Sequence, residues 1–100
     1  MINAFVRPNR CCGGRDVKLE VKDSQGIIFS ATQCSGSCGG YAPLPDEKDW
    51  SPVDLETVEL WGACLSYVAF WRNGEECAFS TVPAALKVLV QRLLDEYRPL

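Results

Sequence analysis

Hydrophobic and charged residues alternate between positions 17 and 22, which is the pattern of a half-buried β-strand. Three aliphatic residues are separated by charged ones, in the order Val17, Lys18, Leu19, Glu20, Val21 and Lys22. Ser24-Gln25-Gly26 then provides a three-residue loop with glycine at its left-handed position. We therefore predict a hairpin over residues 16–33. Its register pairs Asp23 with Ile27, Val21 with Phe29 and Leu19 with Ala31, and on a polar face Lys18 with Thr32 and Glu20 with Ser30.

A second hairpin is predicted around Asn73-Gly74, which separates two apolar segments. Asn-Gly is a strong hairpin signal because a type I′ turn requires positive φ at both central residues. The turn places the opposite charges of Arg72 and Glu75 across from each other. The same register pairs Phe70 with Cys77 and Val68 with Phe79.

An amphipathic helix is predicted from Pro83 to Tyr97. Ser80 or Thr81 is expected to cap its N-terminus, and Pro83 lies in the first turn, where its missing N–H costs nothing. Apolar residues recur at helical spacing at Leu86, Leu89, Val90, Leu93 and Tyr97.

The remaining segments have weaker patterns. Residues 2–6 suggest a short edge strand, and residues 41–49 an irregular connection containing Pro43 and Pro45. Ser51-Pro52-Val53-Asp54 resembles a helix start. Residues 52–71 fit either one helix that ends near Asn73 or a short helical turn followed by a strand. We prefer the strand for Tyr67–Arg72 because Arg72 and Glu75 pair well around the turn.

These elements predict one α+β domain spanning residues 1–100. Its fold is a small antiparallel sheet built from two β-hairpins, with the C-terminal amphipathic helix packed on it. The length suits one domain, and the hydrophobic content of 47% is ordinary for a globular protein.

The sequence contains no histidine. This removes the Ser-His-Asp and Cys-His mechanisms and the usual acid–base residue near neutral pH. Pairs of adjacent acids occur, but nothing indicates two carboxylates facing each other across a cleft. We therefore expect a non-enzymatic protein.

The net charge of −3 arises in the second half of the chain. Residues 51–100 carry seven acidic and four basic residues, whereas the first half carries six of each. An acidic chain is a poor candidate for direct binding of nucleic acid. No run is apolar and long enough to cross a bilayer, so no membrane contact is expected. The default location is cytoplasmic.

Four cysteines are predicted to converge at the open end of the first hairpin: Cys11, Cys12, Cys34 and Cys38. The extended register places Cys12 opposite Cys38 and Cys34 opposite Asp16. These thiols are free, or bind zinc as thiolates, or form disulfides that stabilise a secreted domain. Cys64 and Cys77 lie among apolar residues and are expected to be isolated and buried.

Cys34-Ser-Gly-Ser-Cys38 resembles the Cys-x-Gly-x-Cys of cystine-knot growth factors, over about the first third of the chain. The closing Cys-x-Cys of that family is absent and the last third is predicted to be helical. We therefore do not assign the chain to that family.

The predicted function is binding and blocking of another macromolecule. Catalysis is disfavoured by the missing histidine and the small size of the chain. The expected partner is a protein with a basic surface, contacted through Tyr67, Trp71, Glu75 and Glu76. Tryptophan is enriched at interfaces, and charge of one sign attracts an oppositely charged partner. Small phage-encoded inhibitors of host defence and immunity proteins are of this physical type, by analogy only. A zinc or redox module at the four cysteines is the alternative.

Overall fold

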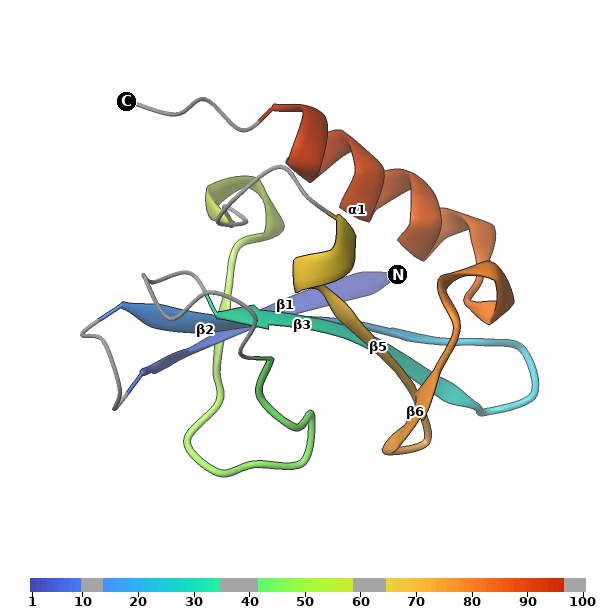
Figure 1. The fold of residues 1–100 in the computed structure, drawn as a ribbon. Helices are drawn as coiled ribbons and strands as arrows, with labels where there is room; N and C mark the ends of the chain where they lie inside the picture. Colours follow the sequence, from blue (N-terminus) through green and yellow to red (C-terminus); the bar gives the residue numbers. More distant parts are fainter. Residues whose placement is uncertain (10–13, 35–41, 59–64, 97–100) are drawn as a thin grey trace.

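A computed structural model describes residues 1–9, 14–34, 42–58 and 65–96. In these residues a six-stranded antiparallel sheet, in the order β4-β1-β2-β3-β5-β6, carries one α-helix on one face (Figure 1). The strands are β1 (Ile2–Pro8), β2 (Arg15–Lys22), β3 (Ile28–Cys34), β4 (Ser51–Val53), β5 (Ala69–Arg72) and β6 (Glu75–Cys77), and the helix is α1 (Ala84–Asp95). Short 3₁₀ turns span Leu55–Thr57, Leu65–Tyr67 and Phe79–Thr81. The predicted α+β class, with a helix packed on an antiparallel sheet, is confirmed.

The first hairpin, β2–β3, has the predicted register from Asp16–Cys34 to Lys22–Ile28. Gly26 adopts a φ of 84°, in the left-handed region that its place in the loop requires. The Asp23 N–H donates to the Ile27 carbonyl at 2.9 Å, and the Asp23 carboxylate accepts the Ile27 N–H at 2.8 Å. The residues of the turn therefore predicted the register of this hairpin correctly.

The second hairpin, β5–β6, is also confirmed, because Arg72 lies opposite Glu75 and Phe70 opposite Cys77. Asn73 and Gly74 have φ values of 49° and 84°, as a type I′ turn demands. The ladder ends at Phe70, so the predicted pair Val68–Phe79 is wrong. Phe79 instead lies in a 3₁₀ turn and packs its ring against Phe70, with a centroid distance of 5.1 Å.

Residues 52–71, which fit either a helix or a turn followed by a strand, end as a strand that begins at Ala69. Leu65–Tyr67 forms a 3₁₀ turn and Val68 precedes the strand, so the preferred strand over Tyr67–Arg72 is confirmed in its last four residues and wrong in its first two. Residues 59–64 lie outside the described part of the chain.

Two further predictions are corrected at the other side of the sheet. Ser51–Val53 is strand β4 and not a helix start, because it pairs with β1 and places Val53 opposite Ala4. Pro52 is tolerated there because β4 is at the edge of the sheet, where one side of the strand needs no N–H donor. Consequently β1 lies between β4 and β2 and is not an edge strand.

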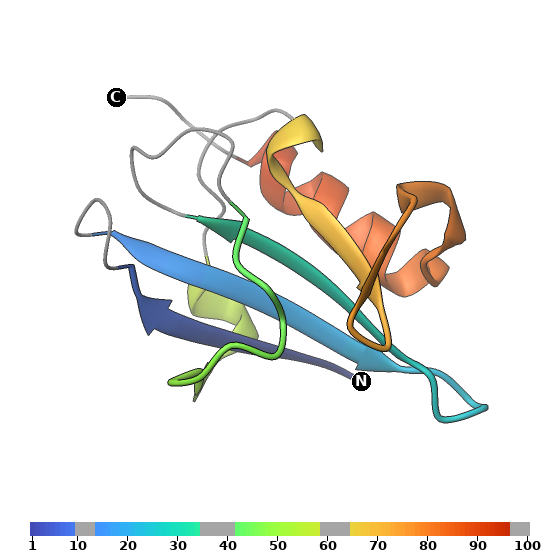
Figure 2. The same ribbon diagram turned by 60° about the horizontal axis from the view of Figure 1, so that its bottom comes forward.

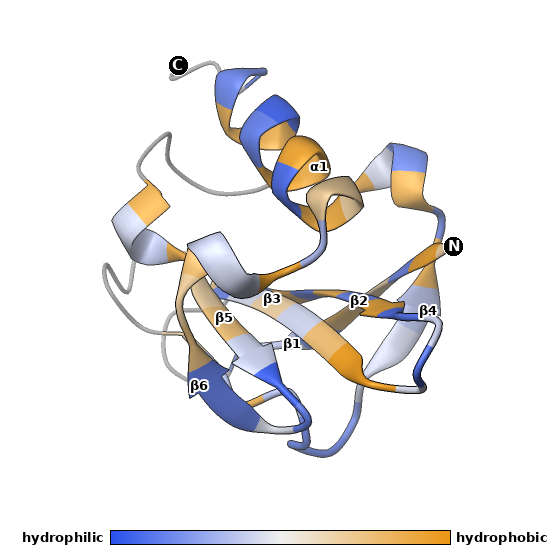
Figure 3. Ribbon diagram, turned by 90° about the vertical axis from the view of Figure 1, so that its right-hand side faces the viewer, coloured by the Kyte–Doolittle hydropathy of each residue, from blue (hydrophilic) through white to orange (hydrophobic). Residues whose placement is uncertain are grey.

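Helix α1 packs its apolar side on one face of the sheet (Figure 3). Leu86, Leu89, Val90 and Leu93 are buried against Leu19, Phe29, Ala31, Phe70 and other core residues, as the spacing predicted. The N-cap is Pro83 and not Ser80 or Thr81, because the Thr81 hydroxyl donates to the Ala78 carbonyl within the preceding 3₁₀ turn. The helix ends at Asp95, and Tyr97 falls outside the described residues.

The opposite face of the sheet is polar, as predicted, yet it is also buried. Asp16, Lys18, Ser30 and Thr32 are each at most 8% exposed. Residues 42–50, here called the strap, cross this face (Figure 2), and Pro43 of the strap is fully buried. The irregular connection predicted for this segment is therefore a second covering layer.

Within the described residues, no helix combines the length and apolar character needed to cross a bilayer.

The packing of α1 predicts unequal effects for neighbouring helix residues. Leu89→Ala should lower the free energy of unfolding by about 2–5 kcal/mol, because it removes a side chain that is only 6% exposed. Val88→Ala is the matched control. Val88 is 68% exposed, so its truncation should change stability by about 0.5 kcal/mol or less. Urea unfolding measures both, and equal losses would contradict the assigned face of the helix.

Candidate functional site

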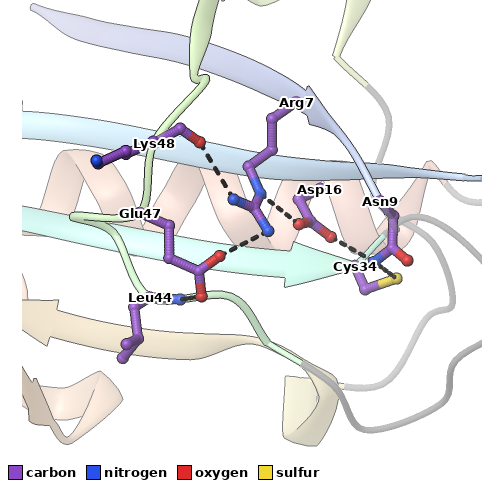
Figure 4. A network of polar contacts seen from close by, with 7 residues as sticks. All are labelled: Arg7, Asn9, Asp16, Cys34, Leu44, Glu47 and Lys48. Carbon is purple, nitrogen blue, oxygen red and sulfur yellow. Dashed lines mark hydrogen bonds and ion pairs between the residues drawn. The ribbon is translucent and has the colours of Figure 1, made fainter. Parts of the chain in front are cut away.

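A network of polar contacts ties the strap to the C-terminal end of β1 and the adjacent N-terminal end of β2 (Figure 4). The Arg7 guanidinium donates to Asp16 at 2.7 Å through Nε and lies 2.6 Å from the Glu47 carboxylate through Nη2. It also donates to the Lys48 carbonyl at 3.1 Å. Asn9 donates to the second oxygen of Asp16 at 2.7 Å. Asp16 is fully buried, so this network compensates a charge that has no access to solvent.

A second cation supports the middle of the strap. The Lys18 ammonium donates to the Pro45 carbonyl at 3.1 Å and lies 3.6 Å from Glu20. It also lies 4.6 Å from the ring centre of Phe5 and 5.1 Å from that of Trp50. Arg7 and Lys18 therefore both hold the strap against this face of the sheet.

Cys34 lies opposite Asp16, as the register predicted. It is buried, and its Sγ is 3.1 Å from Asn9 Nδ2. The other three candidate ligands, Cys11, Cys12 and Cys38, lie outside the described residues. Among the residues that are described, no group of three or more cysteine or acidic side chains is arranged to hold a metal ion. The zinc and disulfide alternatives therefore stay predictions.

Cys77 lies on the second hairpin and is half-buried against the core rather than fully buried. It is a free thiol. Cys64, which was expected to be isolated and buried as well, lies outside the described residues.

Three of the four residues predicted to bind a partner line one pocket of about 240 Å³. The pocket lies at the sheet face that carries the strap, between β5, β6, the 3₁₀ turn before β5 and the first residue of the strap. Among the residues that the structure describes, its lining consists of Ala42, Ser66, Tyr67, Val68, Ala69, Trp71 and Glu76.

Trp71 contributes to the pocket as a buried residue. It is 8% exposed, and its indole Nε1 donates to the Thr32 hydroxyl at 2.9 Å. This bond fixes the ring against β3 and occupies its single donor, so Trp71 offers the pocket an aromatic surface and no hydrogen bond. Tyr67 is 45% exposed and supplies the accessible aromatic group.

Glu75 and Glu76 lie on opposite faces of the hairpin. Glu76 pairs with Trp71 and lines the pocket, whereas Glu75 pairs with Arg72 one position nearer the turn. Successive side chains of a strand point to opposite faces, so Glu75 is directed away from the pocket. Both residues are exposed and belong to a strongly hydrophilic β6 (Figure 3). The structure thus brings Tyr67, Trp71 and Glu76 together and separates Glu75 from them.

The composition of the pocket favours binding over catalysis. Among the seven described residues that line it, Glu76 is the only one with a charge at neutral pH. General acid–base catalysis by two carboxylates would require a second acid across the pocket. An aromatic surface beside one carboxylate instead suits a cationic group.

Sequence reasoning found the aromatic and acidic members of the pocket, and one of its two alanines. Ala69 was recognisable from the strand alternation, because it lies two positions from Trp71 on the same face. Ala42 was not recognisable, since its position depends on how the strap returns across the sheet.

Comparisons with models of protein families, with curated proteins and with solved structures found no match for this chain.

The Arg7–Asp16 pair leads to a stability prediction. Arg7→Met should lower the free energy of unfolding by about 3–5 kcal/mol, because it leaves the buried Asp16 carboxylate without its cation. The double variant Arg7→Met/Asp16→Asn should be more stable than Arg7→Met, since the unpaired charge is gone while an amide can still bond to Asn9.

Arg92→Met is the matched control for this prediction. Arg92 pairs with Glu96 at 3.5 Å on the exposed side of α1, so its loss should cost about 0.5 kcal/mol or less. Urea unfolding of the three variants checks the assignment. A loss for Arg7→Met no larger than that for Arg92→Met would contradict it.

Proposed function

We propose that this protein is a small, acidic, non-enzymatic binding protein of the inhibitor or immunity type, which blocks a partner protein by occupying a basic surface on it. The observation that carries the proposal is the pocket in which Tyr67, Trp71 and Glu76 come together. The sequence predicted each of these three residues to bind a partner.

The burial of Trp71 changes the form that the interface takes. A side chain that is 8% exposed does not insert into a partner. The partner must instead supply the protruding group, which enters the pocket beside Tyr67. A side chain that fills a central, largely desolvated pocket belongs to the class of residues that contribute most of the binding free energy at protein interfaces.

The acidic second half of the chain supports a basic partner. The charges of Glu75 and Glu76 are exposed on β6 at the edge of the sheet. Exposed charges of one sign raise the association rate with an oppositely charged surface and make binding depend on salt. Glu76 adds a short-range contact in the pocket, whereas Glu75 acts only at longer range.

The test begins with capture of a partner from the native host, followed by binding measurements on the purified pair. Tyr67→Ala and Glu76→Lys should each weaken binding by about tenfold or more at low salt, which corresponds to about 1.4 kcal/mol. Trp71→Ala is unsuitable because Trp71 is buried and its loss would disturb the sheet.

Glu75→Lys is the matched control, since it makes the same charge change one residue away on the other face. It should alter the association rate and its salt dependence more than the dissociation rate. If Tyr67→Ala and Glu76→Lys both bind the partner as tightly as the parent protein, this face is not the interface and the proposal fails.

A further inference from the structure

We propose that the pocket lined by Tyr67, Trp71 and Glu76 accepts one arginine side chain of the partner. The guanidinium would lie against the aromatic rings and pair with the Glu76 carboxylate. This inference rests on the proposed function and names the chemical group that the pocket recognises.

The size of the pocket favours a single side chain. Sites for small molecules and cofactors usually enclose about 300–1,000 Å³, and this pocket encloses about 240 Å³. A free cofactor would be only partly covered, whereas the end of one long side chain fits within this volume.

The polar groups of the pocket favour a cation. Glu76 supplies a negative charge, and no lysine or arginine is among the seven described lining residues. The indole N–H of Trp71, which would otherwise attract an acceptor, is directed to Thr32. The aromatic rings of Trp71 and Tyr67 also line the pocket, and a ring face attracts positive charge as the carboxylate does.

Two properties favour arginine over lysine. The guanidinium is planar, so one face can stack on an aromatic ring while its edge donates two parallel hydrogen bonds to a carboxylate. It is also more weakly hydrated than an ammonium group and loses less solvation on entering a small pocket.

The chain itself already contains a guanidinium that lies against an aromatic ring and pairs with carboxylates. The Arg7 guanidinium lies 5.6 Å from the ring centre of Trp50 while it pairs with the carboxylates of Asp16 and Glu47. Arg7 and Trp50 are contributed by β1 and the strap, and together they secure two segments that are distant in sequence. We infer that the partner's arginine makes the equivalent contact at the edge of the sheet.

The experiment is an NMR titration of the full-length ¹⁵N-labelled protein with three short blocked peptides of the form Gly-Xaa-Gly. Xaa is arginine, lysine or citrulline, the uncharged analogue of arginine. The arginine peptide should shift the amide resonances of Tyr67, Ala69 and Glu76 and the indole resonance of Trp71. Its Kd should be lower by about fivefold than that of the lysine peptide and by about tenfold than that of the citrulline peptide.

Two variants complete the test. They carry the same substitution on opposite faces of the second hairpin. Glu76→Gln should weaken binding of the arginine peptide by about fivefold or more, whereas Glu75→Gln should leave it within about twofold. Both positions are exposed, and the same spectra show whether each variant is folded.

Three results would overturn the inference. They are no shifts at the pocket with the arginine peptide, equal affinity for arginine and either of the other peptides, or equal effects of the two variants. Failure here is distinguishable from failure of the proposed function. If a partner's binding still depends on Tyr67 and Glu76 while the arginine peptide does not bind, the interface is correct and only its ligand group was misassigned.

Discussion

The two central strands of the sheet, β2 and β3, are buried on both faces, although one of those faces carries ionised side chains. Asp16 and Lys18 alternate with Val17 and Leu19 along β2, so the strand cannot bury its apolar side under α1 without directing its charges to the other side. Burying such charges is favourable only when each has a partner of good geometry. Arg7 and Asn9 satisfy Asp16, and Pro45 and Glu20 contact Lys18. The position of the strap follows from this requirement.

The same requirement links the interior of the molecule to its candidate interface. The strap is held at Pro45, Glu47 and Lys48 by cations of the sheet, and it begins at Ala42, which forms one wall of the pocket. The buried polar face and the pocket are therefore parts of one surface, covered by the strap over β1 and β2 and left open beside β5 and β6. A change that released the strap would alter the pocket as well as the stability of the fold.

Local chemistry predicted the parts of this fold that depend on neighbours in sequence. The Ser24–Gly26 and Asn73–Gly74 turns require positive φ at defined residues, and each of them determined the register of its hairpin. The apolar spacing from Leu86 to Leu93 determined which side of α1 faces the sheet. Long-range pairing determined the rest. Ser51-Pro52 has the local features of a helix start, but pairing with β1 makes it a strand.

The same distinction applies to the candidate site. Strand alternation and the turn register place Trp71 and Glu76 on one face and Glu75 on the other, so this part was available from sequence. The alternation predicted a half-buried strand over residues 17–22, yet both faces of β2 and β3 are buried. Ser30 and Thr32 are small and leave room for the strap. Their small size was the feature of the sequence that could have indicated a covered polar face. Trp71 is buried and bonds to Thr32 on β3, and this contact between strands is not revealed by any local pattern.

The attachment of the second hairpin to β3 fixes the position of β5, which lines the pocket next to the edge strand β6. The Asn73 N–H donates to the Ile28 carbonyl at 2.8 Å, and the Asn73 side chain accepts the Ile28 N–H at 3.0 Å. Near the other end of β5, Thr32 lies opposite Ala69 and accepts the bond from the Trp71 indole. Ala69 and Trp71, which line the pocket from β5, are therefore held in place within the fold. In the proposed complex these two residues would gain little order, because they are already fixed against β3. The entropic cost of binding would then fall on the exposed Tyr67 and Glu76 side chains and on the incoming side chain.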